Sequence, residues 1–108
     1  MKKVPDDALV FIQRCVRARK IHWTYHVNMR LAGRYLTRDE ILDAVDSYEN
    51  IESYPEDKYL PSYLLLTARG FHVQFATDVE GDNVRIVTAY RPDPNEWNLD
   101  MKTRRSQK

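Results

Sequence analysis

Residues 62–90 read SYLLLTARGFHVQFATDVEGDNVRIVTAY, and this stretch contains three apolar or alternating runs of strand length: residues 62–69, 71–78 and 84–90. The runs are joined at Gly70 and at residues 80–83, where Gly, Asp and Asn favour turns. Short strands separated by such turns are typical of an antiparallel meander. A further strand is expected over residues 50–54.

The middle run alternates, so it predicts which side chains face the core. Successive side chains of a strand point to opposite faces of the sheet. Phe71, Val73 and Phe75 should therefore lie on the buried face. His72, which alternates with them, should lie on the other face together with Gln74 and Ala76.

The chain before residue 47 predicts two to three helices. A first helix is expected over residues 6–19 and a second from residue 26, ending at Gly33. Between them, residues 21–25 are β-branched and aromatic and should be extended. Thr37 and Glu40 form a capping box that begins a third helix. The predicted fold class is therefore α+β, with these helices packed on a twisted antiparallel sheet of about four strands.

Composition indicates one soluble domain. The chain has 108 residues, of which 43% are hydrophobic and 31% are charged. We expect a single α+β domain over residues 1–98, with Trp97 folded back onto it, and a flexible basic tail over residues 99–108. The one cysteine, Cys15, lies in an apolar helical pattern and should be buried. No run approaches the length of a membrane span, so a cytoplasmic location and no membrane partner are expected.

Charge is distributed unevenly along the chain. Residues 8–38 contain seven Arg or Lys and no acid, whereas residues 39–57 contain eight acids and no base. Within the basic part, His26, Arg30 and Arg34 are spaced at i, i+4 and i+8 and would form one stripe on a helix. Such a stripe suits a phosphate, or it is simply a solvated helix face; the charge pattern alone favours neither.

Two other kinds of catalytic site are disfavoured. His22 and His26 have zinc-ligand spacing only if both lie on one helix, and the residues between them place His22 before the helix. We therefore predict no metal and no cofactor. Cys15 has no base beside it and lacks the access that a catalytic thiolate needs.

The remaining side chains suit metal-free cleavage of RNA. That reaction needs a base for the 2′-hydroxyl, cations for the phosphorane and an acid for the leaving oxygen. His26 and His72 are candidates for base and acid, Tyr90 or Tyr54 could donate a proton or stack on a base, and Arg30 and Arg34 could hold the phosphate. Structural alternatives exist for individual residues: His26 could cap the helix start, Arg34 could pair with Asp39 or Glu40, and Tyr90 could be core.

Five ordered blocks resemble a family of small bacterial proteins known as a domain of unknown function, which is similar to the RelE-type and barnase-like ribonuclease toxins. The blocks are His26-x-x-x-Arg30-x-x-x-Arg34-x-Leu36-Thr37, Glu52-Ser53-Tyr54-Pro55, Pro61-Ser62-Tyr63-Leu64-Leu65-Leu66, Phe71-His72-Val73 and Ile86-Val87-Thr88-Ala89-Tyr90-x-Pro92-Asp93-Pro94. They extend over about residues 21–97, which leaves the first helix outside. The resemblance implies the α+β toxin fold and recurrent polar residues at His26, Arg30, Arg34, His72, Thr88 and Tyr90. Val27 departs from the small residue that often follows the first histidine.

Together, these patterns predict a toxin-like, metal-independent ribonuclease acting on single-stranded or ribosome-bound RNA. His26, His72 and Tyr90 are its predicted catalytic residues; the predicted substrate-binding residues are Arg30, Arg34, Tyr54 and Thr88. The alternative is a non-catalytic member of the same fold that binds protein or nucleic acid. The candidate partners are RNA, an antitoxin-like protein and a second copy of the chain. Catalysis requires His26 and His72 in one pocket, whereas binding requires only the basic surface.

Overall fold

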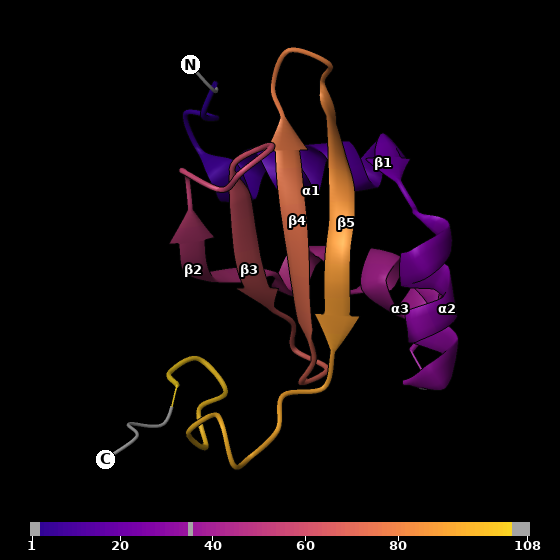
Figure 1. Cartoon of the computed structure of the whole chain (residues 1–108), viewed down its shortest axis with the longest axis vertical. Coiled ribbons are helices and arrows are strands. Elements are labelled where there is room, and N and C mark those ends of the chain that lie inside the picture. Colours follow the sequence, from indigo (N-terminus) through magenta and orange to yellow (C-terminus); the bar gives the residue numbers. More distant parts are fainter. Residues whose placement is uncertain (1–2, 35, 105–108) are drawn as a thin grey trace.

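A computed structural model of the chain describes residues 3–34 and 36–104. Its elements are, in order, α1 (Ala8–Arg17), β1 (Ile21–His22), α2 (Tyr25–Gly33), α3 (Arg38–Asp43), a 3-10 helix (Val45–Ser47), β2 (Glu49–Tyr54), β3 (Ser62–Leu66), β4 (His72–Asp78) and β5 (Asn83–Tyr90). The strand order in the sheet is β1-β5-β4-β3-β2. The predicted α+β class is confirmed (Figure 1).

The sheet has five strands where about four were predicted. Strands β2 to β5 form the expected antiparallel meander. The additional strand is β1, which pairs with β5 in parallel, with Ile21 opposite Val84 and His22 opposite Arg85. Its residues are extended as predicted, and they add a strand because the meander leaves one edge of β5, the edge away from β4, open for pairing.

Each of the three α-helices begins at a side-chain cap. The carboxylate of Asp7 accepts a hydrogen bond from the Val10 amide, and the hydroxyl of Thr24 accepts one from the Val27 amide. The predicted cap at Thr37 is also present, since its hydroxyl accepts a bond from the backbone N–H of Glu40 at 3.1 Å. These bonds satisfy N–H groups that have no partner inside the helix, so they fix where α1, α2 and α3 start.

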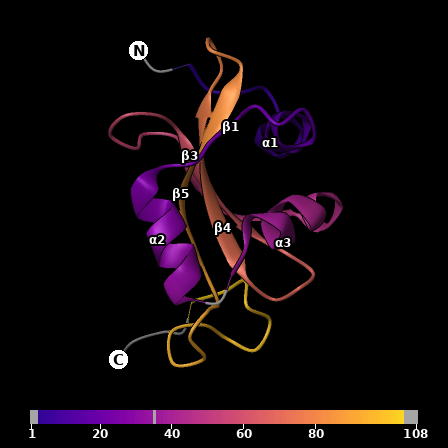
Figure 2. The ribbon, with the colours of Figure 1, turned by 90° about the vertical axis from the view of Figure 1, so that its right-hand side faces the viewer.

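The helices occupy both sides of the sheet. Figure 2 shows α1 and α3 on one side and α2 on the other, beside β5. Phe71, Val73 and Phe75 are buried in the core beneath α1, as the alternation predicted, and Cys15 is buried in the same core. Because α1 and α3 cover only this face, the other face of the sheet is left for α2 and for the C-terminal segment.

Residues 97–104, which we call the C-terminal strap, fold back across the foot of the sheet (Figure 1). Trp97 is only 2% exposed, as its predicted return to the domain requires. We expected a flexible tail over residues 99–108; of these, Lys102 pairs with Glu49 at 3.0 Å and Arg104 pairs with Glu52 at 2.8 Å. Up to residue 104 the strap therefore makes specific contacts with β2, and residues 105–108 lie outside the described residues.

None of the helices in the described part of the chain is both long and apolar enough to cross a bilayer.

Candidate functional site

The strand register brings the predicted site residues of the sheet onto one face. Residues directly opposite each other on neighbouring strands point to the same side. His72 lies opposite Tyr90, and Thr88 lies opposite Gln74, the neighbour of His72 on its face of β4. Tyr54 lies opposite Ser62, and Ser62 lies opposite Ala76, so Tyr54 points to this face as well. We call this side of the sheet, opposite α1 and α3, the open face.

The open face extends past β5 to the edge strand. Arg85 of β5 lies opposite Ala76 of β4 and opposite His22 of β1. Because Ala76 is on the open face, Arg85 and His22 are on it too. Both are exposed. In the described part of the chain, the side chain of Arg85 makes no hydrogen bond or ion pair. Sequence reasoning placed neither residue at the site, because β1 has only two residues and its pairing with β5 leaves no periodic signal.

Arg34 connects α2 to the open face. Its Nη1 donates to the hydroxyl of Thr88 at 3.1 Å and to the carbonyl of Ala89 at 2.7 Å. Its side chain thus bonds to β5 rather than to Asp39 or Glu40, the partners considered from the sequence. Arg34 fixes the last turn of α2 against β5 and brings two predicted substrate-binding residues into contact.

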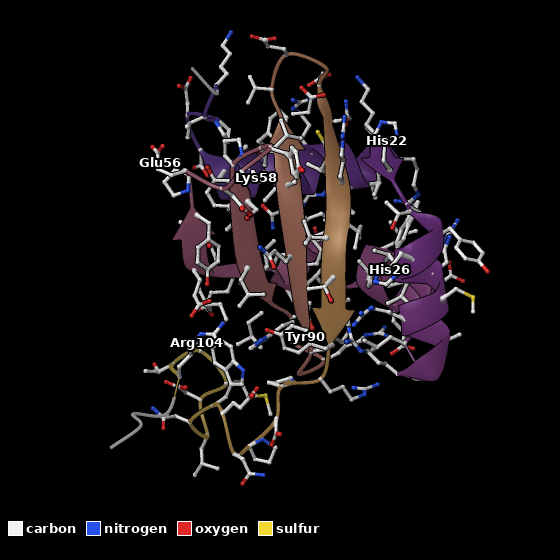
Figure 3. The ribbon with its side chains drawn as sticks, in the orientation of Figure 1. His22, His26, Glu56, Lys58, Tyr90 and Arg104 are labelled. Carbon is white, nitrogen blue, oxygen red and sulfur yellow. The ribbon has the colours of Figure 1, made fainter. Side chains whose placement is uncertain are left out.

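His26 and Arg30 form a second pair on α2. The Nε of Arg30 donates to Nε2 of His26 at 2.7 Å, and both side chains are exposed. Since arginine can only donate, Nε2 is an acceptor here and the ring proton lies on Nδ1. Figure 3 shows His26 on the side of α2 that faces β5. The helix cap is Thr24, so His26 is not needed for capping.

His72 is sealed beneath the strap. Its side chain is 0% exposed, its Nε2 lies 2.6 Å from the carbonyl oxygen of Met101, and its Nδ1 lies 3.3 Å from the hydroxyl of Tyr90. A carbonyl only accepts, so Nε2 carries the proton and Nδ1 accepts from Tyr90. The ring of Trp97 packs edge-on against His72 at 4.4 Å. Burial lowers the pKa of His72 and raises the pKa of Tyr90, so both are neutral near pH 7.

An ionic cluster closes this end of the open face. Arg104 donates to both carboxylate oxygens of Glu52, at 2.8 and 3.1 Å, and its guanidinium lies 4.5 Å from the ring of Trp97. Tyr54 donates its hydroxyl hydrogen to the same carboxylate. The bond from Arg104 lowers the pKa of Glu52. Figure 3 shows Arg104 and Tyr90 at the same end of the sheet.

The predicted site residues thus form two groups. His26, Arg30, Arg34 and Thr88 lie along the flank between α2 and β5, whereas His72, Tyr90 and Tyr54 lie beneath or beside the strap. Within residues 3–34 and 36–104, no hydrogen bond or ring contact joins His26 to His72. The long-range contacts of the strap with Glu52 and His72 follow no sequence pattern, so the sequence could not reveal that His72 is covered.

The positions of His22 and His26 decide whether these two side chains have zinc-ligand spacing on one helix. His22 lies in β1 and His26 in α2, so the prediction that His22 precedes the helix is confirmed. Among the described residues there is no cluster of three or more His, Cys, Asp or Glu side chains with the arrangement of a metal site.

A protein-family model described as "Domain of unknown function (DUF4258)" matches residues 23–91, which is more than half of the chain. The chain belongs to this family. The DUF4258 segment includes all seven predicted site residues, from His26 to Tyr90. Helix α1, strand β1 and the strap lie outside it, so Trp97 and Met101, which cover His72, are not part of the matched segment. No curated protein and no solved structure matches the chain.

Proposed function

We propose that the protein binds single-stranded or ribosome-bound RNA across the open face and cleaves it without a metal, as a toxin-like ribonuclease. The observation that carries the proposal is the bond from Arg34 to Thr88, which holds the cationic stripe of α2 beside the open face. The resemblance of five sequence blocks to RelE-type and barnase-like toxins also supports it.

The flank between α2 and β5 is the proposed phosphate track. Arg30 and Arg85 are exposed, and a guanidinium can bind a phosphate through two parallel hydrogen bonds. His22 and His26 lie along the same flank of β5 (Figure 3). Arg34 is already engaged with β5, so its part in the track is to position α2.

Cleavage begins with His26. When RNA binds, the guanidinium of Arg30 moves to the phosphate and leaves Nε2 of His26 free to accept the proton of the 2′-hydroxyl. The 2′-oxygen then attacks the adjacent phosphorus, and the bond from phosphorus to the 5′-oxygen of the next nucleotide breaks. The products are a 2′,3′-cyclic phosphate and a 5′-hydroxyl.

The leaving oxygen needs a proton, and the pair of His72 and Tyr90 is the proposed source. Once the strap has lifted, water reaches His72 and Nδ1 takes up a proton from the solvent. That proton passes to the oxygen of Tyr90 as the hydroxyl of Tyr90 gives its own proton to the leaving oxygen. The strap must lift because the carbonyl of Met101 and the ring of Trp97 cover His72.

The test is incubation of the purified protein with a labelled single-stranded RNA in EDTA. We expect cleavage to a cyclic phosphate, loss of cleavage in His26→Ala and no loss in Arg17→Ala, a control on α1. Cleavage that persists in His26→Ala, or that stops in EDTA, would contradict the proposal.

Binding is tested through salt. When a cation that binds one phosphate of a single strand is removed, the slope of log affinity against log salt falls by about 0.7. We expect Arg30→Glu and Arg85→Glu each to reduce the slope. Arg17→Glu makes the same charge change on a helix that covers the other face, so it should leave the slope nearly unchanged. If all three variants reduce the slope equally, RNA does not bind specifically to the open face.

A second candidate function is a non-catalytic binding module. The burial of His72, and its separation from His26 into a different group of residues, favour this candidate. Both ring nitrogens of His72 already have partners inside the protein, which an acid in permanent use would not have. A module of this kind would show the salt dependence of Arg30 and Arg85 but would leave RNA intact. The two experiments together therefore separate the candidates.

A further inference from the structure

The open face contains a pocket that the proposed cleavage steps do not use. It has a volume of about 590 Å³ and is lined by Ser53, Tyr54, Pro55, Glu56, Asp57 and Gln74. It forms because β2 ends at Tyr54 and Pro55 begins a turn that carries the next two residues out from the sheet. Figure 3 shows Glu56 on the opposite border of the open face from His22 and His26. A strand of RNA that crosses this face could reach the phosphate track and the pocket together.

The orientation of Gln74 is fixed by a chain of hydrogen bonds. Its Nε2 donates to the hydroxyl of Ser62 at 3.0 Å, and that hydroxyl donates to the carboxylate of Asp57 at 2.6 Å. Ser62 is fully buried, so water does not compete for these bonds. One hydrogen of the amide nitrogen is therefore engaged with Ser62, and Oε1 of Gln74 is left as a hydrogen-bond acceptor. No described residue donates to Oε1.

The pocket presents mostly acceptors. Besides Oε1 of Gln74, it has the carboxylate of Glu56, and the negative charges of Glu56 and Asp57 would repel a phosphate. The carboxylate of Asp57 already accepts bonds from the Ser62 hydroxyl and the Lys58 amide. Ser53 lies opposite Tyr63, which lies opposite Phe75, so the side chain of Ser53 points to the core face and its hydroxyl is not among the groups on the open face. The best ligand is thus a group without negative charge that carries several adjacent hydrogen-bond donors.

Tyr54 adds a flat surface to this pocket. Its side chain is 38% exposed, and its hydroxyl is held by Glu52, which limits the movement of the ring. Aromatic side chains with an exposed face are the usual stacking partners of unpaired bases. The pocket therefore combines a stacking surface with an acceptor-rich edge.

We propose that this pocket binds a guanine base of the RNA on the open face. Guanine is the only one of the four bases whose pairing edge has two adjacent donors, N1–H and the N2 amino group, beside one acceptor, O6. The donors would face Gln74 Oε1 and the carboxylate of Glu56, while the base stacks on Tyr54. The inference rests on the proposed function for its RNA, but the pocket can be tested without RNA.

The test uses nucleosides, which carry no phosphate and cannot be cleaved. Guanosine, inosine and adenosine are titrated into labelled full-length protein, and the Gln74 side-chain amide and the Tyr54 ring are followed by NMR. We expect guanosine to shift both signals, and inosine, which lacks the N2 amino group, to bind about tenfold more weakly. Adenosine should produce little change at Gln74.

Two substitutions sharpen the test. Gln74→Met keeps the length of the side chain but removes the acceptor, so guanosine should bind about tenfold more weakly. Gln13→Met is the matched control on α1, where Gln13 bonds the carbonyl of Val45, and it should leave guanosine binding unchanged. If Gln74→Met does not fold, the comparison of the three nucleosides on the wild-type protein still decides.

The outcomes separate this proposal from the proposed function. Guanosine shifts with uncut RNA would support the pocket and reject cleavage. No shift with guanosine, or equal shifts with adenosine, would overturn the pocket even if RNA is cut. Shifts with N-acetyl-arginine amide but not with guanosine would also overturn it, and would assign the pocket to a basic side chain of a protein partner.

Discussion

Replacing Trp97 with alanine should release the strap and expose His72 while the helical core stays folded. Trp97 is 2% exposed and packs against His72, but it is not a member of the hydrophobic cluster that joins the helices to the sheet. Its removal should therefore act locally on residues 97–104.

The magnitude follows from the interactions of the strap. Truncating a buried tryptophan typically costs about 3–5 kcal/mol. The bond from His72 to the carbonyl of Met101 contributes about 1 kcal/mol more, and the half-exposed pair of Arg104 with Glu52 contributes at most about 1 kcal/mol. We expect the free energy of unfolding to fall by about 3 kcal/mol or more in Trp97→Ala. In Tyr59→Ala, whose aromatic ring is 79% exposed, it should change by less than about 0.5 kcal/mol.

Two measurements check this prediction. Urea unfolding followed by circular dichroism gives the free energy, and an NMR pH titration of His72 reports its cover. Burial now lowers the pKa of His72, so its pKa should rise toward the ordinary value of about 6.5 when the strap is released. An unchanged titration of His72 in Trp97→Ala would refute the idea that the strap seals the ring.

Three further predictions concern stability. Phe75→Ala removes a fully buried ring from the core and should lower the free energy of unfolding by about 3–5 kcal/mol; a melting temperature within a degree or two of the wild type would be inconsistent with this burial. Thr88→Val removes one acceptor of Arg34 and should cost about 1 kcal/mol in urea unfolding, and a stabilised variant would show that this bond does not hold α2. Because the pKa of His72 is lower in the folded than in the unfolded protein, its contribution to stability is complete above about pH 6.5 and decreases as the pH falls below that value, where the unfolded chain binds more protons. Urea midpoints at pH 7.5 and 5.5 check this: the midpoint should fall more on acidification in the wild type than in His72→Gln. A smaller fall in the wild type would contradict the prediction.

Most of the fold could be predicted from the sequence because its signals are local. The alternation around Phe75 predicted the buried face of β4, and the cap at Thr37 predicted the start of α3. Strand β1 was missed as a strand because two extended residues give no periodic pattern. Its pairing depends on where β5 has a free edge, which only the assembled sheet determines.

The candidate site was predicted only in part, because some of its features depend on local patterns and others on long-range contacts. Alternation predicted that His72 leaves the core face, and the register then aligned it with Tyr90. The cover over His72 depends on Met101, which is 29 residues away in the sequence, and no pattern links the two. The stripe on α2 has helical spacing, but only the structure reveals that Arg34 turns to β5 while Arg30 turns to His26.

The binding surface is tested most directly by mapping a single-stranded RNA on the labelled protein by NMR at low salt. The account predicts that amide and side-chain signals of His26, Arg85, Thr88 and Gln74 shift together, while those of α1 and α3 stay in place. Shifts confined to α1 and α3, with the open face unchanged, would contradict it.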